Sequence, residues 1–183
     1  MSYTNNTGLP SPTTILSPFI NADYFTEESR IRGTRVHAAC ANHLLGKFVI
    51  IEKKYRGYLD SFKRWCDEEQ PEALIVEKRL ISTNYGYCGM PDFFGRIKNR
   101  PACGVADLKT SVALGKAWPL QVAAYERLCF ETEPDMVQET IWSCSLRLKS
   151  DGSYPLVEYY NDFELRFNIF LGALNLYRHF GPK

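Results

Sequence analysis

The residues with the clearest chemical potential lie in two short stretches in the middle of the chain, Gly-Met-Pro-Asp at 89–92 and Asp-Leu-Lys-Thr at 107–110. Asp92 and Asp107 each follow apolar sequence that we expect to be interior, and a buried carboxylate must be paired or coordinated. Lys109 alone can pair comfortably with only one of them. Carboxylate oxygens, backbone carbonyls and water are the ligands that Mg²⁺ and Mn²⁺ prefer. The sequence therefore predicts a divalent-cation site on Asp92 and Asp107, with the Leu108 carbonyl as a further ligand.

The two aspartates can meet only if the strands that carry them form a hairpin. Residues 87–97 and 102–109 are strand-like and are separated by the turn residues 99–101. Alternation along the second strand would then put Asp107 and Lys109 on one face and Leu108 on the other face, in the core. In that position Lys109 could orient or deprotonate an attacking water, or neutralise charge at a phosphate.

The remaining elements predict one α/β domain over residues 15–183, with the order α-α-β-β-β-α-β-β-α. We expect Thr26 to cap a helix over 26–45 that ends at Gly46, and Pro119 to start a helix over 118–130. Asp162 should cap the last helix, which runs to about residue 180. The other expected elements are a helix over 55–68, a strand over 73–82, and a hairpin of 138–148 with 155–159 around residues 151–152. Residues 1–14, rich in Thr, Asn, Ser and Pro, predict a flexible arm.

Composition limits the protein class without selecting a function. The chain has 183 residues, 45% of them hydrophobic, and a formal net charge of +1. These values exclude a disordered chain and neither demand nor exclude a polyanionic partner. No apolar run approaches the roughly 18 residues that a membrane span needs, and residues 1–20 show no basic, apolar leader. We expect no membrane partner.

The cysteines argue against a thiolate metal centre. The chain has six cysteines at wide intervals and no C-x-x-C pair, so neither a zinc ribbon nor an iron–sulfur cluster is expected. Reduced thiols in a cytoplasmic compartment are the better interpretation. There is also no G-x-x-x-x-G-K-[ST] loop, so we expect no nucleotide cofactor, and any unwinding of DNA would need a partner.

The order of the polar residues resembles a known group of nucleases. Pro91-Asp92 followed by Asp107-Leu108-Lys109 resembles the PD-(D/E)XK nuclease superfamily. Gln121 and Tyr125 resemble the Q-x-x-x-Y motif of its RecB-type branch, and residues 33–37 (Gly-Thr-Arg-Val-His) resemble the G-x-x-x-H motif of that branch. Residues 12–16 are similar to the start of phage-encoded and mitochondrial genome-maintenance exonucleases. The resemblance spans most of the chain, from about residue 12 to residue 128.

The resemblance implies a restriction-endonuclease-like core, a central mixed β-sheet flanked by helices, and metal-dependent hydrolysis of DNA phosphodiester bonds by Mg²⁺ or Mn²⁺. It implies a cytoplasmic enzyme of a bacterial cell or phage-infected host, acting in recombination, repair or phage DNA processing. Asp92 and Asp107 would bind the metal, and Lys109 would activate the water. His37 would be a further metal ligand, and Glu77 would bind the metal or a metal-bound water. Gln121 and Tyr125, which lie at i and i+4, would contact the phosphate or Lys109.

Several alternatives stay open at this point. The enzyme could be an exonuclease, a structure-selective or nicking endonuclease, or a catalytically silent DNA-binding or assembly protein on the same fold. His37 alone would be an ordinary polar residue of a helix, and Glu77 could belong to a solvated strand edge. Tyr125 could be a core tyrosine, and Gln121 could simply face solvent.

Basic residues cluster before the first expected strand. They could be solvated helix faces, or they could follow the backbone of a single strand or duplex end of DNA without sequence preference. The apolar circumference of the last helix also allows an oligomer, and a recombination or helicase partner is possible. The candidate DNA contacts are Arg30, Arg35, Lys53, Lys54 and Arg56, together with Gln121 and Tyr125.

Overall fold

The computed structural model describes residues 8–20, 26–111, 114–136 and 142–181. Its centre is a mixed five-stranded sheet in the order β1-β4-β5-β6-β7, in which β5 and β6 are parallel and the other neighbours antiparallel. The strands are β1 (Glu72–Ile75), β4 (Phe93–Ile97), β5 (Arg100–Lys109), β6 (Trp142–Arg147) and β7 (Leu156–Tyr159). The expected α/β fold, a central mixed sheet flanked by helices, is confirmed.

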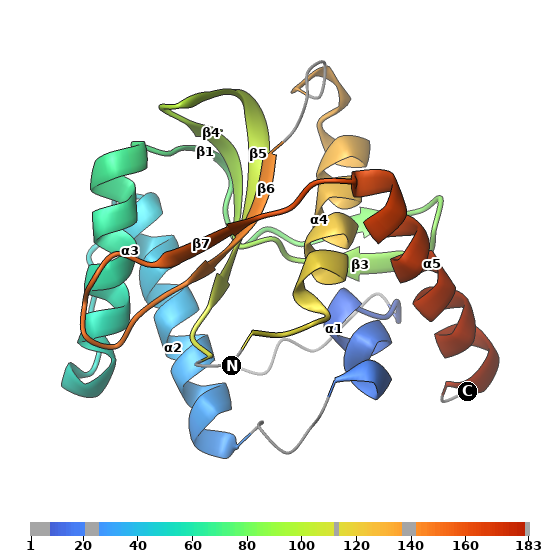
Figure 1. The fold of residues 1–183 in the computed structure, drawn as a ribbon, viewed down its shortest axis with the longest axis horizontal. Coiled ribbons are helices and arrows are strands. Elements are labelled where there is room, and N and C mark those ends of the chain that lie inside the picture. The colour runs from blue at the N-terminus through green and yellow to red at the C-terminus, as the bar shows by residue number, and fades with distance from the viewer. Residues whose placement is uncertain (1–7, 21–25, 112–113, 137–141, 182–183) are drawn as a thin grey trace.

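Helices cover both faces of this sheet (Figure 1). One layer contains α2 (Glu27–Leu44) and α3 (Arg56–Glu69), and the other contains α4 (Trp118–Thr132) and α5 (Phe163–Phe180). Each layer has its own buried core, and successive residues of β5 serve the two cores alternately: Val105 packs toward α4, and Leu108 packs toward α2 and α3. The central strands β4, β5 and β6 are therefore buried on both faces, whereas the edge strands β1 and β7 are largely exposed.

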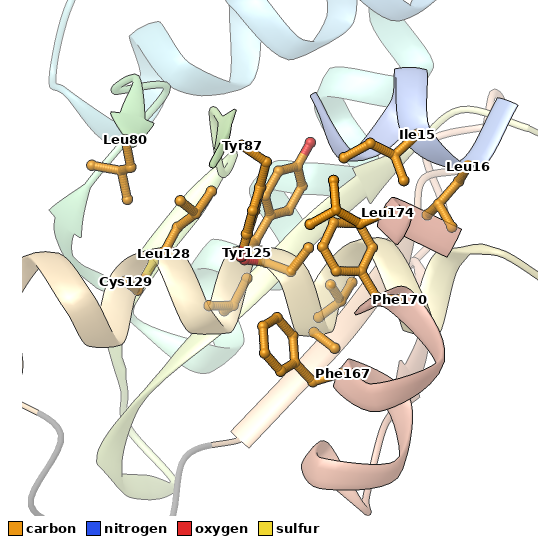
Figure 2. Packing of buried hydrophobic residues seen from close by; sticks show 14 of the residues in the cluster. Ile15, Leu16, Leu80, Tyr87, Tyr125, Leu128, Cys129, Phe167, Phe170 and Leu174 are labelled. Carbon is orange, nitrogen blue, oxygen red and sulfur yellow. The ribbon is translucent and has the colours of Figure 1, made fainter. Parts of the chain in front are cut away.

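A short first helix, α1 (Pro12–Leu16), packs on the α4–α5 layer. The Ser11 hydroxyl accepts a hydrogen bond from the Thr14 N–H, and Pro12 occupies the first turn, where its missing N–H costs nothing. Figure 2 shows Ile15 and Leu16 beside side chains of α5. The predicted flexible arm over 1–14 is therefore wrong for residues 12–14, because a cap and two buried side chains hold them; residues 1–7 lie outside the described part.

The helix predictions are largely confirmed. The Thr26 hydroxyl caps α2 by accepting from the Ser29 N–H, and Gly46 follows with the positive φ of 64° that ends many helices. A 3₁₀ turn (Lys53–Tyr55) precedes α3. The predicted cap of α5 is wrong: Asp162 is in the N-cap position, but its backbone is left-handed and its side chain makes no capping hydrogen bond.

Two predicted strands are each divided in the structure. The stretch 73–82 contains β1 and β2 (Leu80–Ser82), and 87–97 contains β3 (Tyr87–Gly89) and β4. β2 and β3 pair in a separate two-stranded sheet. Glu77 turns the first stretch with a left-handed φ of 48°, and Pro91, which has no N–H for a ladder, interrupts the second. Glu77 and Asp92 therefore lie at the junctions between the two sheets. The expectation that both residues lie within strands is wrong.

The last predicted hairpin is confirmed, since β6 and β7 pair antiparallel around residues 151–152. The beginning of its first expected strand, 138–141, lies outside the described residues. Among the helices that the structure describes, none combines the length and the apolar character needed to cross a bilayer.

Candidate functional site

The β4–β5 hairpin brings the two aspartates to the same place. Phe93 pairs with Ala106, so Asp92, one residue before the ladder, stands opposite Asp107. Both carboxylates are buried, with Asp107 only 2% exposed. Leu108 points into the α2–α3 core, as the alternation predicted. The expected hairpin and the expected faces of β5 are therefore confirmed.

Both oxygens of Asp92 have partners. Oδ1 lies 2.8 Å from Nδ1 of His37, and Oδ2 accepts a hydrogen bond of 2.7 Å from the Leu108 N–H. The ladder with β4 ends at Phe93, so this carboxylate replaces the missing strand partner of Leu108. The backbone of β5 therefore fixes the orientation of Asp92. Whether the Leu108 carbonyl is also a ligand stays a prediction.

His37, Glu77 and Asp92 form a group that could hold a metal ion. Their ligand atoms lie within 4.8 Å of one another, although the residues come from α2, from the loop after β1 and from the junction before β4. His37 Nδ1 is 3.9 Å from Oε1 of Glu77. One imidazole nitrogen and two carboxylates make a donor set suited to Mn²⁺ and compatible with Mg²⁺.

Asp107 lies outside this group of three and faces Lys109. Its Oδ2 forms a buried ion pair with the Lys109 ammonium, at 2.6 Å. The carboxylates of Glu77, Asp92 and Asp107 thus gather beside one imidazole and one ammonium, and this donor set fits the divalent metal that the sequence predicted.

A chain of hydrogen bonds holds Lys109 from the side of α4. The Lys109 ammonium donates to Oε1 of Gln121 at 2.9 Å, and Nε2 of Gln121 donates to the Tyr125 hydroxyl at 3.0 Å. Nε2 also lies 3.4 Å from the hydroxyl of Thr13 in α1. Gln121 and Tyr125 share one helix face, as their spacing predicted. Neither points only to solvent or only into the core.

The metal-free cluster retains protons near neutral pH. Burial acts to lower the pKa of His37, but the charge and the hydrogen bond of Asp92 outweigh it and raise this pKa to about 9. Burial, aided by the charge of Asp92, raises the pKa of Glu77 to about 7. Burial would raise the pKa of Asp92 too, yet the neighbouring His37 holds it below its ordinary value. Burial raises the pKa of Asp107 despite the opposing charge of Lys109.

The five basic residues predicted as DNA contacts are all exposed, on α2 and around the start of α3. Four of them have a carboxylate nearby, at distances between 2.6 and 3.9 Å, so their field is partly neutralised. These pairs are Arg30 with Glu27, Arg35 with Glu52, Lys54 with Glu28, and Arg56 with Asp60. A contact with DNA stays a prediction for this surface.

Two residues beside the site were not assigned a role from the sequence. Thr13 was placed in the arm, although the resemblance began at residue 12. Trp118 was treated only as the start of a helix, yet the Lys109 ammonium lies 5.6 Å from the centroid of its indole. The sequence offered one indication that Trp118 lies at the site, because it is three residues before Gln121 on the same helix.

Comparison with known proteins supports the architecture. No family model and no curated protein matches the sequence. A crystal structure named "Putative exonuclease" from Eubacterium rectale is similar with a TM-score of 0.50 at 8% identity, covering 86% of this chain and 67% of that chain. Two structures of an alkaline exonuclease, LHK-Exo, one from Laribacter hongkongensis and one in complex with dAMP, match with TM-scores of 0.31 at 15% and 14% identity. They cover 94% of this chain and 91% and 93% of their own chains. The first likeness shows a shared fold.

Proposed function

We propose that this protein is a metal-dependent deoxyribonuclease, and within that class an exonuclease. The observation that carries the proposal is the convergence of two buried carboxylates and an ammonium at the end of the β4–β5 hairpin, next to the group formed by His37 and Glu77. Burying the Asp92 and Asp107 carboxylates, at 7% and 2% exposure, is costly in a purely structural role, and a bound cation would stabilise both. The fold shared with a protein named as an exonuclease favours that reaction over others.

The metal would be held by His37, Glu77, Asp92 and Asp107, with the Leu108 carbonyl as a further ligand. A bound Mg²⁺ or Mn²⁺ supplies a Lewis acid at the phosphate and lowers the pKa of a nearby water. Burial of both aspartates strengthens their attraction to the cation, because charges interact more strongly where water is excluded. The Leu108 N–H keeps Asp92 aimed at the site before the cation arrives.

Lys109 would orient the attacking water, or take its proton, and would face the charge that develops on the phosphate. Gln121 and Tyr125 limit where its ammonium can lie, through bonds of 2.9 and 3.0 Å. A DNA phosphate could accept a hydrogen bond from Nε2 of Gln121 in place of the Tyr125 hydroxyl, so Gln121 would contact the substrate or position the lysine. Arg30, Arg35, Lys53, Lys54 and Arg56 would add contacts with the DNA backbone that weaken as salt rises.

The first experiment compares DNA substrates. Linear end-labelled DNA and closed circles, single- and double-stranded, are incubated with the protein in Mg²⁺, in Mn²⁺ or in EDTA. We expect metal-dependent loss of linear DNA while circles remain intact. Cutting of circles would replace the exonuclease by an endonuclease. Absence of cleavage by the folded protein under every metal would overturn the proposal and favour a silent DNA-binding protein.

Single substitutions then test the site. Lys109→Ala should lower kcat by about 100-fold or more, since a positioned acid–base group contributes 10²–10⁴-fold. Asp107→Asn should lower it as well, because it removes a carboxylate from the proposed metal site. Asp67→Asn and Lys98→Ala are matched controls, because both residues are exposed and lie on α3 and in the turn between β4 and β5. Full activity of either site variant, with the fold intact by circular dichroism, would show that the reacting groups lie elsewhere.

A further inference from the structure

A pocket of about 200 Å³ lies beside the proposed catalytic residues. Ser145 and Arg147 of β6 line it, and in the parallel β5–β6 register they are the partners of Asp107 and Lys109. Register partners project from the same face of a sheet, and neighbouring strands are about 4.8 Å apart. The pocket therefore begins one strand away from the proposed reacting groups, on their face of the sheet.

The walls of the pocket have two kinds of chemistry. Trp118, Leu114 and Leu156 provide apolar surface, and both leucines are strongly exposed, at 63% and 46%. Ser145, Arg147 and Glu158 provide a hydroxyl, a guanidinium and a carboxylate. The volume is below the roughly 300–1,000 Å³ of pockets for drug-sized ligands. Such a space suits one flat ring system with polar edges.

The Trp118 indole is held in a fixed place by Gly115. A Cβ on Gly115 would lie 2.2 Å from Nε1 of the indole, so only glycine allows this contact. The backbone N–H of Trp118 also donates to the Gly115 carbonyl at 3.0 Å, which fixes the backbone that carries the indole. The same indole contacts Lys109, at 5.6 Å from ammonium to centroid, within the range of a cation–π interaction. A preorganised aromatic ring thus connects the proposed catalytic lysine to the pocket.

We propose that this pocket binds a DNA base, the one belonging to the nucleotide next to the phosphate that is cleaved, and that the base stacks on Trp118. This inference rests on the nuclease function proposed above and specifies how its substrate is held. Stacking on an aromatic side chain accepts every base, because every base has a π-face. The polar side chains of the pocket can meet the polar edge of the base. Because stacking on Trp118 is the main contact, the site selects for the presence of a base more than for its identity.

Intrinsic fluorescence tests base binding without any cleavage. Of the three tryptophans, Trp65 and Trp142 are buried at 0% and 5% exposure, and Trp118 is half-buried, so a ligand in the pocket changes the emission of Trp118. In EDTA, dAMP should quench the wild-type protein, and deoxyribose 5-phosphate should not. In the Trp118→Phe variant any remaining change in emission comes from Trp65 and Trp142, so this variant gives the background signal. Equal responses to the two ligands would overturn base binding.

Steady-state kinetics test the role of the pocket in the reaction. Oligonucleotides that are intact, or that carry one abasic residue at successive positions from the end, serve as substrates. Trp118→Ala should raise KM for the intact strand by about fivefold or more, the range expected for a lost stacking interaction. Trp118→Phe should restore most of the loss. With the abasic residue at the pocket position, wild type and Trp118→Ala should have the same KM.

Two further variants separate the pocket from Lys109. Leu156→Ala removes a pocket wall, and Leu74→Ala is its matched control, since Leu74 is 43% exposed on β1, the opposite edge strand of the sheet. Gly115→Ala should displace the indole and mimic Trp118→Ala. Equal KM values for intact and abasic strands in the wild type would overturn the proposal that the pocket binds a base, without affecting the proposed nuclease function. Absence of all cleavage would overturn the nuclease, and the fluorescence comparison would still decide base binding.

Discussion

At the scale of single residues, protons and a cation compete for the same ligand atoms. Nδ1 of His37 is bonded to Asp92, and these two residues, with Glu77, are three of the proposed metal ligands. A ligand must lose its proton before it binds a metal, so a raised pKa weakens metal binding below that pKa. His37, with a pKa of about 9, and Glu77, with a pKa of about 7, both act in this direction.

The affinity for Mn²⁺ should therefore increase with pH between about 6 and 9. Above pH 7 the His37 proton dominates, and the association constant should rise by up to about tenfold per pH unit. Isothermal titration calorimetry in buffers of different ionisation enthalpy measures both the affinity and the protons released. His37→Gln should flatten the slope between pH 7 and 9. An affinity that does not change over this range in the wild type would show that His37 carries no displaceable proton.

How much of the site could be predicted depended on the range of each contact. Asp107 and Lys109 share a strand, and Gln121 and Tyr125 share a helix, so alternation and helical spacing predict their common faces. The meeting of His37 with Asp92 joins α2 to the hairpin, and only a resemblance to other proteins indicated it. Thr13 and Trp118 could not be assigned, because their roles arise from packing of α1 and α4 against the end of β5.

At the scale of elements, the helices were predicted better than the strands. Caps and stops such as Thr26 and Gly46 act locally and are readable in the sequence. The two divided strands depend on partners instead: β2 pairs with β3, whereas β1 pairs with β4. Pro91 indicated the break, since proline removes a ladder donor. The left-handed turn at Glu77 had no such indication.

One buried ion pair joins the elements of the α4–α5 layer. Arg166 of α5 lies 2.8 Å from Glu126 of α4 and also donates to the Pro119 carbonyl and the Ser143 hydroxyl. Both side chains are buried, at 10% and 2% exposure. Arg166 thus ties the first turn of α4, which leads into Gln121, to β6 and α5.

Removing only the arginine should be strongly destabilising. Arg166→Met leaves Glu126 as a buried, unpaired acid, and we expect a loss of about 3–5 kcal/mol in the free energy of unfolding. Urea denaturation measures it. The double variant with Glu126→Leu should recover most of the loss. Arg30→Met is the matched control: its pair with Glu27 is exposed, at 67% and 68%, so its loss should leave the free energy of unfolding nearly unchanged. Equal losses at the two sites would contradict this account.

At the scale of the whole molecule, the layered architecture could be predicted from the order of the elements, but the packing of residues 12–16 against the core could not. Composition predicted an arm, because residues 1–14 contain few large apolar side chains. The structure instead ends this segment in α1, where Ile15 and Leu16 complete the core under α5 (Figure 2). Burial of two adjacent side chains decided the outcome, and two residues are too few for a periodic pattern.

The left-handed backbone at Glu77 has a consequence for the balance between robustness and activity. A non-glycine residue in this conformation costs roughly 1–2 kcal/mol, more than glycine loses in chain entropy. Natural proteins tolerate such local strain mainly where function requires it.

Glu77→Gly should therefore give a metal-free protein as stable as the wild type, or more stable by up to about 1 kcal/mol. Thermal unfolding in EDTA and in Mn²⁺ tests this expectation. Mn²⁺ should raise the Tm of the wild type and raise that of the variant less. A variant that is less stable in EDTA would show that contacts of the Glu77 side chain, and not its backbone, maintain the loop. If the expectation holds, the protein is less stable than it could be at this position, because the loop must place one carboxylate at the proposed metal site.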